Sequence, residues 1–320
     1  MSQLSLDLMR RANKTPFAGT RYGNSGFSLI ELLVGLAIGM VIAIVASTIY
    51  LYSKTAYNAA TETSEMEENG RFALNLVAKY IQSAGFVMVD PKGTLPEGPI
   101  DNKIFGCDLG FVNPTTTASL ADLACRTATP AGELPSASIR LIAETDAYDL
   151  SSAKYQGFDC VGMGSIPTTL ATGTVVNETR SYFVVTHTNV QTPNGTVRMG
   201  QLTCVSDRTL PAGTAAFQMQ PLIPGVEQLR FTYLLPSLID LNSAQRARTA
   251  AQVTSAVNAS DQWPAVLAVE VCVLTKSVQP GGNDTGTTYT DCYGTALAAT
   301  AGESYRTFTT TVRLRNRTSS

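Results

Sequence analysis

The chain has 320 residues, of which 44% are hydrophobic and only 15% are charged, so it can form one large domain or two modest ones. Its formal net charge of −2 gives no support for a nucleic-acid partner, which would need a basic face, so none is expected. His187 is the one histidine, which excludes a cluster of histidines as a metal or catalytic site, and we expect no metal and no cofactor.

An uncharged, mostly apolar segment extends from Leu32 to Ser53, which is long enough for a helix that spans a bilayer. Basic residues dominate before this segment, whereas acidic residues dominate soon after Lys54. Because the basic side of a membrane segment stays in the cytoplasm, we predict a single-pass protein of a bacterial inner membrane with a cytoplasmic N-terminus and a periplasmic head. A cleaved signal peptide fits less well, since the apolar run is long and no small-residue cleavage site closely follows it.

Residues 26–33, at the entrance to this segment, read Gly-Phe-Ser-Leu-Ile-Glu-Leu-Leu. A carboxylate such as that of Glu31 is costly at the edge of a membrane helix, so it either reaches the headgroups or has a partner or function. The eight residues resemble the processing site of type IV prepilins.

This resemblance implies that a membrane-bound prepilin peptidase cuts after Gly26 and removes residues 1–26 as a leader. Glycine suits that position because it has no side chain to obstruct the scissile segment. Phe27 then becomes the N-terminus and is N-methylated. Glu31, one helical turn later, is expected to pair with the N-terminal ammonium of a neighbouring subunit, because an unpaired carboxylate is penalised among apolar helices.

The helical pattern continues beyond the apolar segment. Residues 54–84 contain no proline and only one glycine, Gly70, and Gly85 stands where a C-cap belongs. We therefore predict one helix over Phe27–Ala84, about 87 Å long at ~1.5 Å per residue. The apolar stripe of its second half consists of Ala73, Leu76, Val77, Tyr80 and Ala84.

The two halves of this helix are expected to have different surroundings. Residues 27–53 would lie in the membrane or in the core of a filament, and residues 54–85 would pack on a globular head. A bend or local melting is expected near Gly35, Gly39 or Gly70, since glycine weakens a helix.

From residue 86 the sequence changes to short β-rich runs separated by turn residues, which predicts a head over residues 86–320. The apolar residues alternate with polar ones over 307–314, as in a strand with one buried face. We predict an α+β, pilin-like fold in which a mainly antiparallel sheet covers the helix stripe, with a short surface helix at Asn242–Val257. The expected strands are Ser138–Ala143, Ser181–Thr186, Val197–Cys204, Val226–Leu235, Ala265–Lys276 and Tyr305–Asn316.

Further stretches resemble the PilW family of minor pilins. The run Glu-Asn-Gly-Arg-Phe-Ala-Leu at 68–74 and the closing Ala-Gly at 84–85 lie in the helix, and three looser stretches follow at 223–231, 263–269 and 310–317. Their order and spacing carry the resemblance, whereas residues between about 86 and 220 show little similarity to that family.

Six cysteines are even in number and include no Cys-x-x-Cys pair, so in an exported head three disulfides are the natural interpretation. Six cysteines allow fifteen pairings. Proximity in sequence suggests Cys272–Cys292 and Cys107–Cys125, which leaves Cys160–Cys204.

Several weaker signals favour ordinary structure. His187 ends a β-rich run and is expected to be a surface or half-buried strand residue rather than a ligand or base. The glycine-rich runs at 162–165 and 281–286 lack the context of a phosphate loop and of an EF-hand, respectively. Four aspartates near turns are expected on the solvated surface, namely Asp108, Asp122, Asp146 and Asp149.

The resemblance implies a minor pilin rather than an enzyme, placed at the filament tip where it helps to start assembly. Its expected partners are prepilin peptidase, other minor pilins, the major pilin, a large tip adhesin and the inner membrane before assembly. The motif at 26–33 leaves open a pseudopilin of a type II secretion system. A single-pass envelope enzyme or binding protein is the alternative from another class, but the head offers it no constellation of acid, base or metal ligands.

Overall fold

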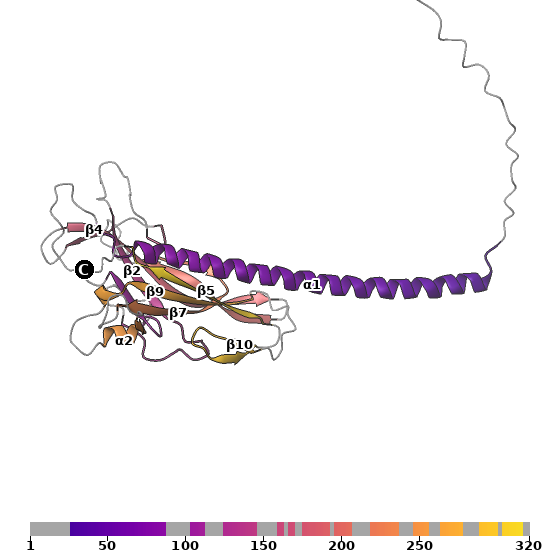
Figure 1. The fold of residues 1–320 in the computed structure, drawn as a ribbon. Helices are drawn as coiled ribbons and strands as arrows, with labels where there is room; N and C mark the ends of the chain where they lie inside the picture. The colour runs from indigo at the N-terminus through magenta and orange to yellow at the C-terminus, as the bar shows by residue number, and fades with distance from the viewer. Residues whose placement is uncertain are drawn as a thin grey trace, which may run out of the picture. The chain divides into compact units, whose positions relative to one another are not determined.

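The structure is a computed structural model that describes residues 26–87, 103–112, 124–145, 159–162, 166–169, 175–192, 195–206, 218–236, 246–255, 263–277, 288–299 and 303–315 (Figure 1). The chain divides into two compact units, Met1–Lys54 and Thr55–Ser320, and each is described by itself. The run at 281–286 and three of the aspartates, Asp122, Asp146 and Asp149, lie outside the described residues.

Helix α1 is a single helix over Leu29–Ser83, within two residues of the predicted bounds. Its first turn begins where the Ser28 carbonyl accepts hydrogen bonds from the backbone N–H groups of Glu31 and Leu32, at 3.0 and 3.2 Å. The helix continues through all three of its glycines, so the expectation of local melting there was wrong. Gly85, two residues beyond the last helical residue, has a φ of 74°, the left-handed conformation that favours glycine after a helix.

The first unit contains the apolar part of α1. All residues from Gly26 to Lys54 are exposed, although this part has an 18-residue window of mean hydropathy 2.7. By length and composition this helix can cross a membrane. Its backbone hydrogen bonds are satisfied within the helix, as a lipid environment requires.

In the second unit, α1 buries one stripe of side chains that recur three or four residues apart, as an amphipathic helix does. Three members of the predicted stripe are buried, and Leu76 and Tyr80 are half-buried. The stripe also begins earlier than predicted, because Met66 and Gly70 are covered as well. The buried residues are Met66, Gly70, Ala73, Leu74, Val77, Ile81 and Ala84.

The strands form antiparallel sheets, as predicted, but there are two larger sheets and a small one among the described residues. The six-stranded sheet has the order β1-β2-β4-β5-β6, with β3 also paired to β4, and the four-stranded sheet has the order β12-β9-β7-β8. The first comprises β1 (Ile104–Cys107), β2 (Ser138–Thr145), β3 (Ile166–Thr169), β4 (Val175–Thr192), β5 (Gly195–Ser206) and β6 (Gln218–Pro224). The second comprises β7 (Val226–Leu235), β8 (Arg246–Arg248), β9 (Ala268–Lys276) and β12 (Tyr305–Arg313), and β10 (Thr288–Thr290) pairs with β11 (Ala296–Ala298).

The four-stranded sheet has an inner and an outer face. Its inner face carries the predicted alternating valines of β9, Val269, Val271 and Val273, which belong to the same core cluster as the helix stripe. We call the opposite face, which carries Glu270 and Cys272, the outer face, since side chains alternate along a strand. Strand β9 begins three residues later than predicted because Trp263–Ala265 forms a 3-10 turn, η2.

The predicted helix at Asn242–Val257 was wrong in length. The described part of this segment contains strand β8 followed by the short helix α2 (Ala250–Thr254). The N-terminus of α2 is set by a capping box, in which Thr249 and Gln252 satisfy each other's backbone N–H groups. The residues directly before that cap form β8 and pair with β7, so they are not available to lengthen the helix.

The chain passes from one large sheet to the other at Gly225, between β6 and β7. The Gly225 N–H donates to the carbonyl of Gly200 at 2.9 Å, and its carbonyl accepts from the N–H of Lys276 at 2.7 Å. A Cβ atom on Gly200 would lie 2.3 Å from the carbonyl oxygen of Val226. The backbones of the two sheets therefore meet where only glycine fits.

We predict that Gly200→Ala lowers the free energy of unfolding by roughly 1–3 kcal/mol. The added methyl group would clash with the backbone of Val226, which cannot rotate away as a side chain could. Fluorescence of Trp263, which is the single tryptophan and is 1% exposed, can follow unfolding of the full chain in detergent. The control is Thr188→Ala, at an exposed position of β4. Equal unfolding midpoints for both variants and the wild type would contradict the tight junction.

Candidate functional site

The residues of the N-terminal motif occupy the segment just before α1 and the first turn of this helix. Gly26 and Phe27 precede the helix, and Phe27 is 82% exposed. Glu31 lies in the first helical turn, where the helix dipole favours a negative charge. An accessible non-helical segment, an acid and a long apolar helix thus follow one another.

Three disulfides join strands of the head to neighbouring segments, and their pairs are those that proximity in sequence suggested. They link Cys107 to Cys125, Cys160 to Cys204 and Cys272 to Cys292. Each contributes roughly 2–4 kcal/mol of stability by restricting the unfolded chain. Each also ties a segment of little regular structure to a strand of a large sheet.

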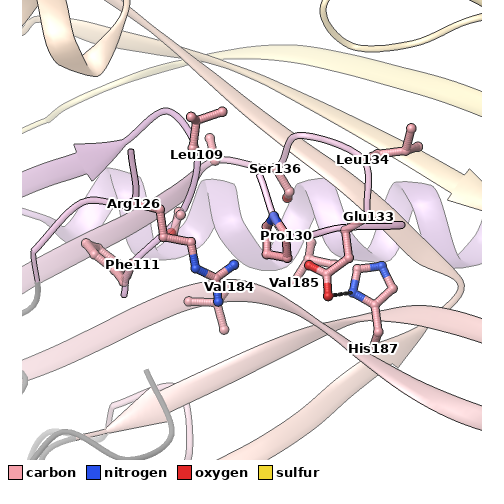
Figure 2. A pocket seen from close by; sticks show the side chains of 13 residues that line it. Leu109, Phe111, Arg126, Pro130, Glu133, Leu134, Ser136, Val184, Val185 and His187 are labelled. Carbon is pink, nitrogen blue, oxygen red and sulfur yellow. Dashed lines mark ion pairs between the residues drawn. The ribbon is translucent and has the colours of Figure 1, made fainter. Parts of the chain in front are cut away.

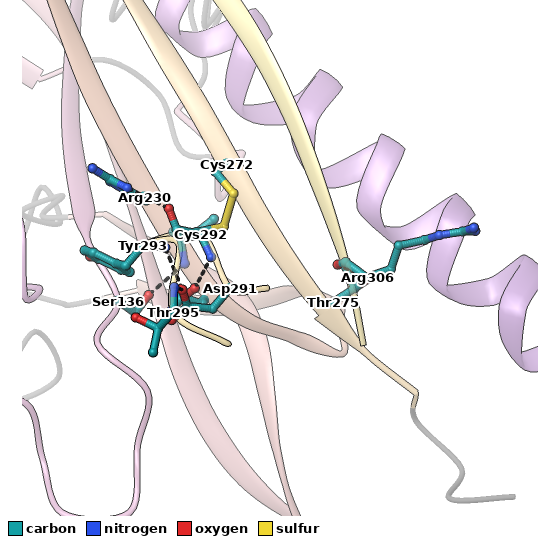
Figure 3. Close-up of a disulfide and its surroundings, with 11 residues drawn as sticks. Ser136, Arg230, Cys272, Thr275, Asp291, Cys292, Tyr293, Thr295 and Arg306 are labelled. Carbon is teal, nitrogen blue, oxygen red and sulfur yellow. Dashed lines mark hydrogen bonds between the residues drawn. A yellow bond between two sulfur atoms is a disulfide. The ribbon is translucent and has the colours of Figure 1, made fainter. Parts of the chain in front are cut away.

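The segment around Cys292 is attached to the outer face by more than its disulfide (Figure 3). Gln228 accepts a hydrogen bond from the Cys292 N–H at 2.8 Å and donates one to the Asp291 carboxylate at 3.2 Å. Asp291 in turn accepts from the N–H groups of Tyr293 and Thr295, at 2.9 and 2.7 Å. This turn is therefore held rigidly in place.

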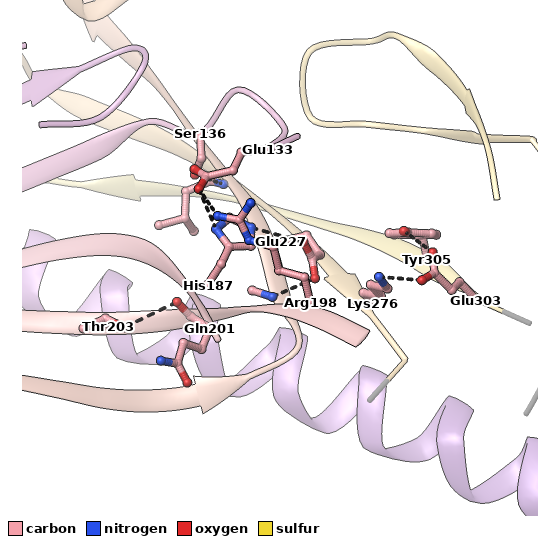
Figure 4. A network of polar contacts seen from close by, with 12 residues as sticks. Glu133, Ser136, His187, Arg198, Gln201, Thr203, Glu227, Lys276, Glu303 and Tyr305 are labelled. Carbon is pink, nitrogen blue, oxygen red and sulfur yellow. Dashed lines mark hydrogen bonds and ion pairs between the residues drawn. The ribbon is translucent and has the colours of Figure 1, made fainter. Parts of the chain in front are cut away.

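His187 lies on β4 as predicted, but its carboxylate neighbours were not foreseen (Figures 2 and 4). Its side chain is 7% exposed, with Nδ1 3.7 Å from Glu133 Oε1 and Nε2 3.4 Å from Glu227 Oε2. Glu227 also accepts from the Gly200 N–H at 2.8 Å, and Arg198 pairs with Glu133. This cluster joins β4, β5 and β7 at the junction of the sheets.

The cavity beside His187 is small (Figure 2). Its volume of about 20 Å³ suits a single water molecule. Among the described residues, no group of three or more His, Cys, Asp or Glu side chains, this one included, is arranged so that it could hold a metal ion. In this part of the chain the histidine cluster therefore supports a structural role rather than a substrate or metal site.

A second buried charge cluster holds the edge of the six-stranded sheet. The Lys103 ammonium pairs with Glu178 and lies 3.5 Å from Glu144, and Arg180 lies 3.3 Å from Glu178. Burial works to raise the pKa of Glu178, but the hydrogen bonds and charges of Lys103 and Arg180 outweigh it and lower that pKa below its ordinary value of 4.5.

Asp108 is not the solvated residue that the sequence suggested. Its two carboxylate oxygens accept from the N–H groups of Ala250 and Ala251, at 2.9 and 3.0 Å, at the start of α2. This contact could not be predicted from the sequence, because the partners lie more than a hundred residues apart along the chain.

Two family models match separate parts of the chain. The prokaryotic N-terminal methylation motif matches residues 21–47, and the family described as type IV pilus-assembly protein W matches residues 181–316. The first match contains the motif at 26–33, and the stretch at 68–74 lies outside both matches. The second match contains most of β4 and the strands that follow, so the expectation of little similarity to the family up to residue 220 was wrong for residues 181–220. No curated protein and no solved structure matches the chain significantly.

We predict that Glu178→Gln lowers the free energy of unfolding by roughly 1–3 kcal/mol at neutral pH, because Lys103 and Arg180 lose a buried charged acceptor. A carboxylate whose pKa is lowered in the folded state stabilises the protein above its unfolded pKa, and this stabilisation is lost as the pH falls through the folded value. The difference between variant and wild type should therefore shrink below about pH 4.

Denaturant titrations of the full chain at several pH values measure this difference. The exposed Glu65→Gln variant is the control and should follow the wild type throughout. A Glu178→Gln effect that stays constant down to about pH 2 would show that the charge of Glu178 is not what stabilises the cluster.

Proposed function

Because the chain belongs to the PilW family of type IV pilus-assembly proteins, we propose that it is a minor pilin that enters a pilus through α1 after removal of its leader. The observation that carries this proposal is the methylation motif at the start of an exposed apolar helix, followed by a head that matches the same pilus family. The PilW family is structural rather than catalytic.

Processing is the first step of the proposed function. Prepilin peptidase cuts after Gly26, removes residues 1–26 and methylates the amine of Phe27. The accessible, non-helical backbone at 26–28 supports this step, because a peptidase needs an extended segment in its site. Residues 27–53 then hold the protein in the inner membrane, residues 54–85 pack on the head, and residues 86–320 form the periplasmic part.

Assembly is the second step. Residues 29–53 leave their apolar side chains exposed along the helix, so these side chains can exchange lipid for the helices of neighbouring subunits. In that apolar surrounding the Glu31 carboxylate pairs with the Phe27 ammonium of a neighbour, which fixes the axial register of the two helices.

The large head supports a low-copy position at the tip rather than a repeated place along the shaft. There it would connect other minor pilins, the major pilin and a tip adhesin, and help to start assembly. The match of residues 181–316 favours the pilus over a type II secretion pseudopilus, which the N-terminal motif alone leaves open.

We predict that Gly26→Val blocks processing in the pilus-bearing host, because a branched side chain obstructs the scissile segment. The intact mass of the protein should then include residues 1–26, whereas wild type and the neighbouring control Ser28→Ala should begin at N-methylated Phe27. A Gly26→Val protein that begins at residue 27 would contradict the assigned cleavage site.

We predict that Glu31→Gln is cleaved normally but enters filaments at least roughly tenfold less well, the change that about 1.4 kcal/mol of lost pairing produces. Immunodetection in sheared pili, relative to the membrane fraction, measures incorporation. Glu65→Gln, which removes an exposed carboxylate from the same helix outside the apolar segment, is the matched control. Equal incorporation of both variants would overturn the role of Glu31.

A further inference from the structure

A recess of about 410 Å³ lies on the outer face of the four-stranded sheet, beside the Cys272–Cys292 disulfide. Cross-strand pairing defines its floor. Thr232 of β7 is opposite Glu270 of β9, and Thr309 of β12 is opposite Cys272, so these side chains share one face. The turn at 290–294 forms its wall.

The wall of this recess is rigid. The disulfide and the bonds of Gln228 hold Cys292 and Asp291, and the Tyr293 hydroxyl donates to the Asp108 carbonyl at 2.8 Å. Arg230 donates to the Cys292 carbonyl at 2.8 Å and lies 5.0 Å from the centre of the Tyr293 ring. A ligand would therefore bind to a preformed surface, and binding would not carry the entropic cost of ordering the turn.

Hydroxyl groups dominate the chemistry of the recess. Its lining includes Thr232, Thr290, Thr307 and Thr309, with Glu270 exposed among them. Each threonine hydroxyl can donate one hydrogen bond and accept others, the carboxylate accepts, and the guanidinium of Arg230 has further N–H donors. This is a mixed set of donors and acceptors, in which the one exposed carboxylate is balanced by one guanidinium.

We propose that this recess binds a neutral saccharide. The hydroxyls of a sugar ring are donors and acceptors in the same way as those of threonine, and a carboxylate or guanidinium can bind two adjacent sugar hydroxyls at once. No function assigned above for α1 uses this face, since the helix stripe packs on the core side of the sheet.

Other ligands fit the lining less well. A protein partner usually inserts an aromatic or aliphatic anchor into an apolar pocket, and the residues that line this recess offer no such pocket. A phosphate would face the Glu270 carboxylate and would find Arg230 as the one cationic side chain of the lining. A divalent cation would find only Glu270 as an exposed carboxylate, because Asp291 is buried and bonded within its own turn.

Saturation-transfer NMR on the full chain, in a detergent without a sugar headgroup, tests the proposal. The probes are methyl glucoside, methyl galactoside and N-acetylglucosamine at millimolar concentrations, with a short oligolysine as a cationic probe. The variants are Thr309→Val and Glu270→Gln, which remove a hydroxyl and a charge from the lining with little change of shape. Thr188→Val is the control, because Thr188 is exposed on β4 of the six-stranded sheet and does not line the recess.

We expect at least one saccharide to receive saturation from the wild type and from Thr188→Val, and binding to be about tenfold weaker in Thr309→Val and Glu270→Gln. Absence of transfer to all three saccharides would overturn the proposal. So would equal transfer in all variants, which would place the sugar elsewhere, and so would binding of oligolysine alone, which would make Glu270 a docking point for a basic partner. These outcomes are independent of processing at Gly26 and of pairing by Glu31.

Discussion

The apolar stripe of α1 between Met66 and Ala84 is the surface around which the head is built. One core cluster contains the part of this stripe from Ala73 to Ala84 together with residues of both large sheets, among them Phe183 of the six-stranded sheet and Val271 of the four-stranded sheet. Neither sheet can bury its inner face without the helix, because a sheet needs a second layer to exclude water. The same continuous helix carries the apolar residues 29–53, so the element that completes the head also carries the segment that is long and apolar enough to cross a membrane.

Much of this arrangement could be predicted because it depends on local patterns. The apolar segment is one long uninterrupted run, whereas the helix stripe and the alternation in β12 each repeat a simple period. Such local patterns are what a single sequence displays best. The motif at 26–33 is equally local. Short elements were missed for the opposite reason, since β8 and η2 exist only because β7 and the core around Trp263 hold them there.

The polar clusters could not be predicted, because their partners are remote in sequence. Lys103 and Glu178 are separated by 75 residues, and Gly200 and Glu227 by 27. His187 read alone is an ordinary strand residue, and only the fold brings Glu133 and Glu227 to its two nitrogens. These side chains are buried, and a buried charge without a partner costs several kcal/mol. Burial therefore favours pairing of the charged groups in both clusters.

The two faces of the four-stranded sheet show how one strand can serve two purposes. Along β9 the residues that face the helix are valines, which any apolar partner of suitable size can cover. On the outer face, Cys272 is linked to a turn that is fixed by directional bonds from Gln228 and Asp291. Directional bonds and a disulfide specify one geometry, whereas apolar packing tolerates several. The outer face also has a small core cluster around Cys272, Leu274 and Cys292, which supports the turn from below. A preformed polar surface, such as the recess beside that turn, can therefore be built on the outer face next to this cluster.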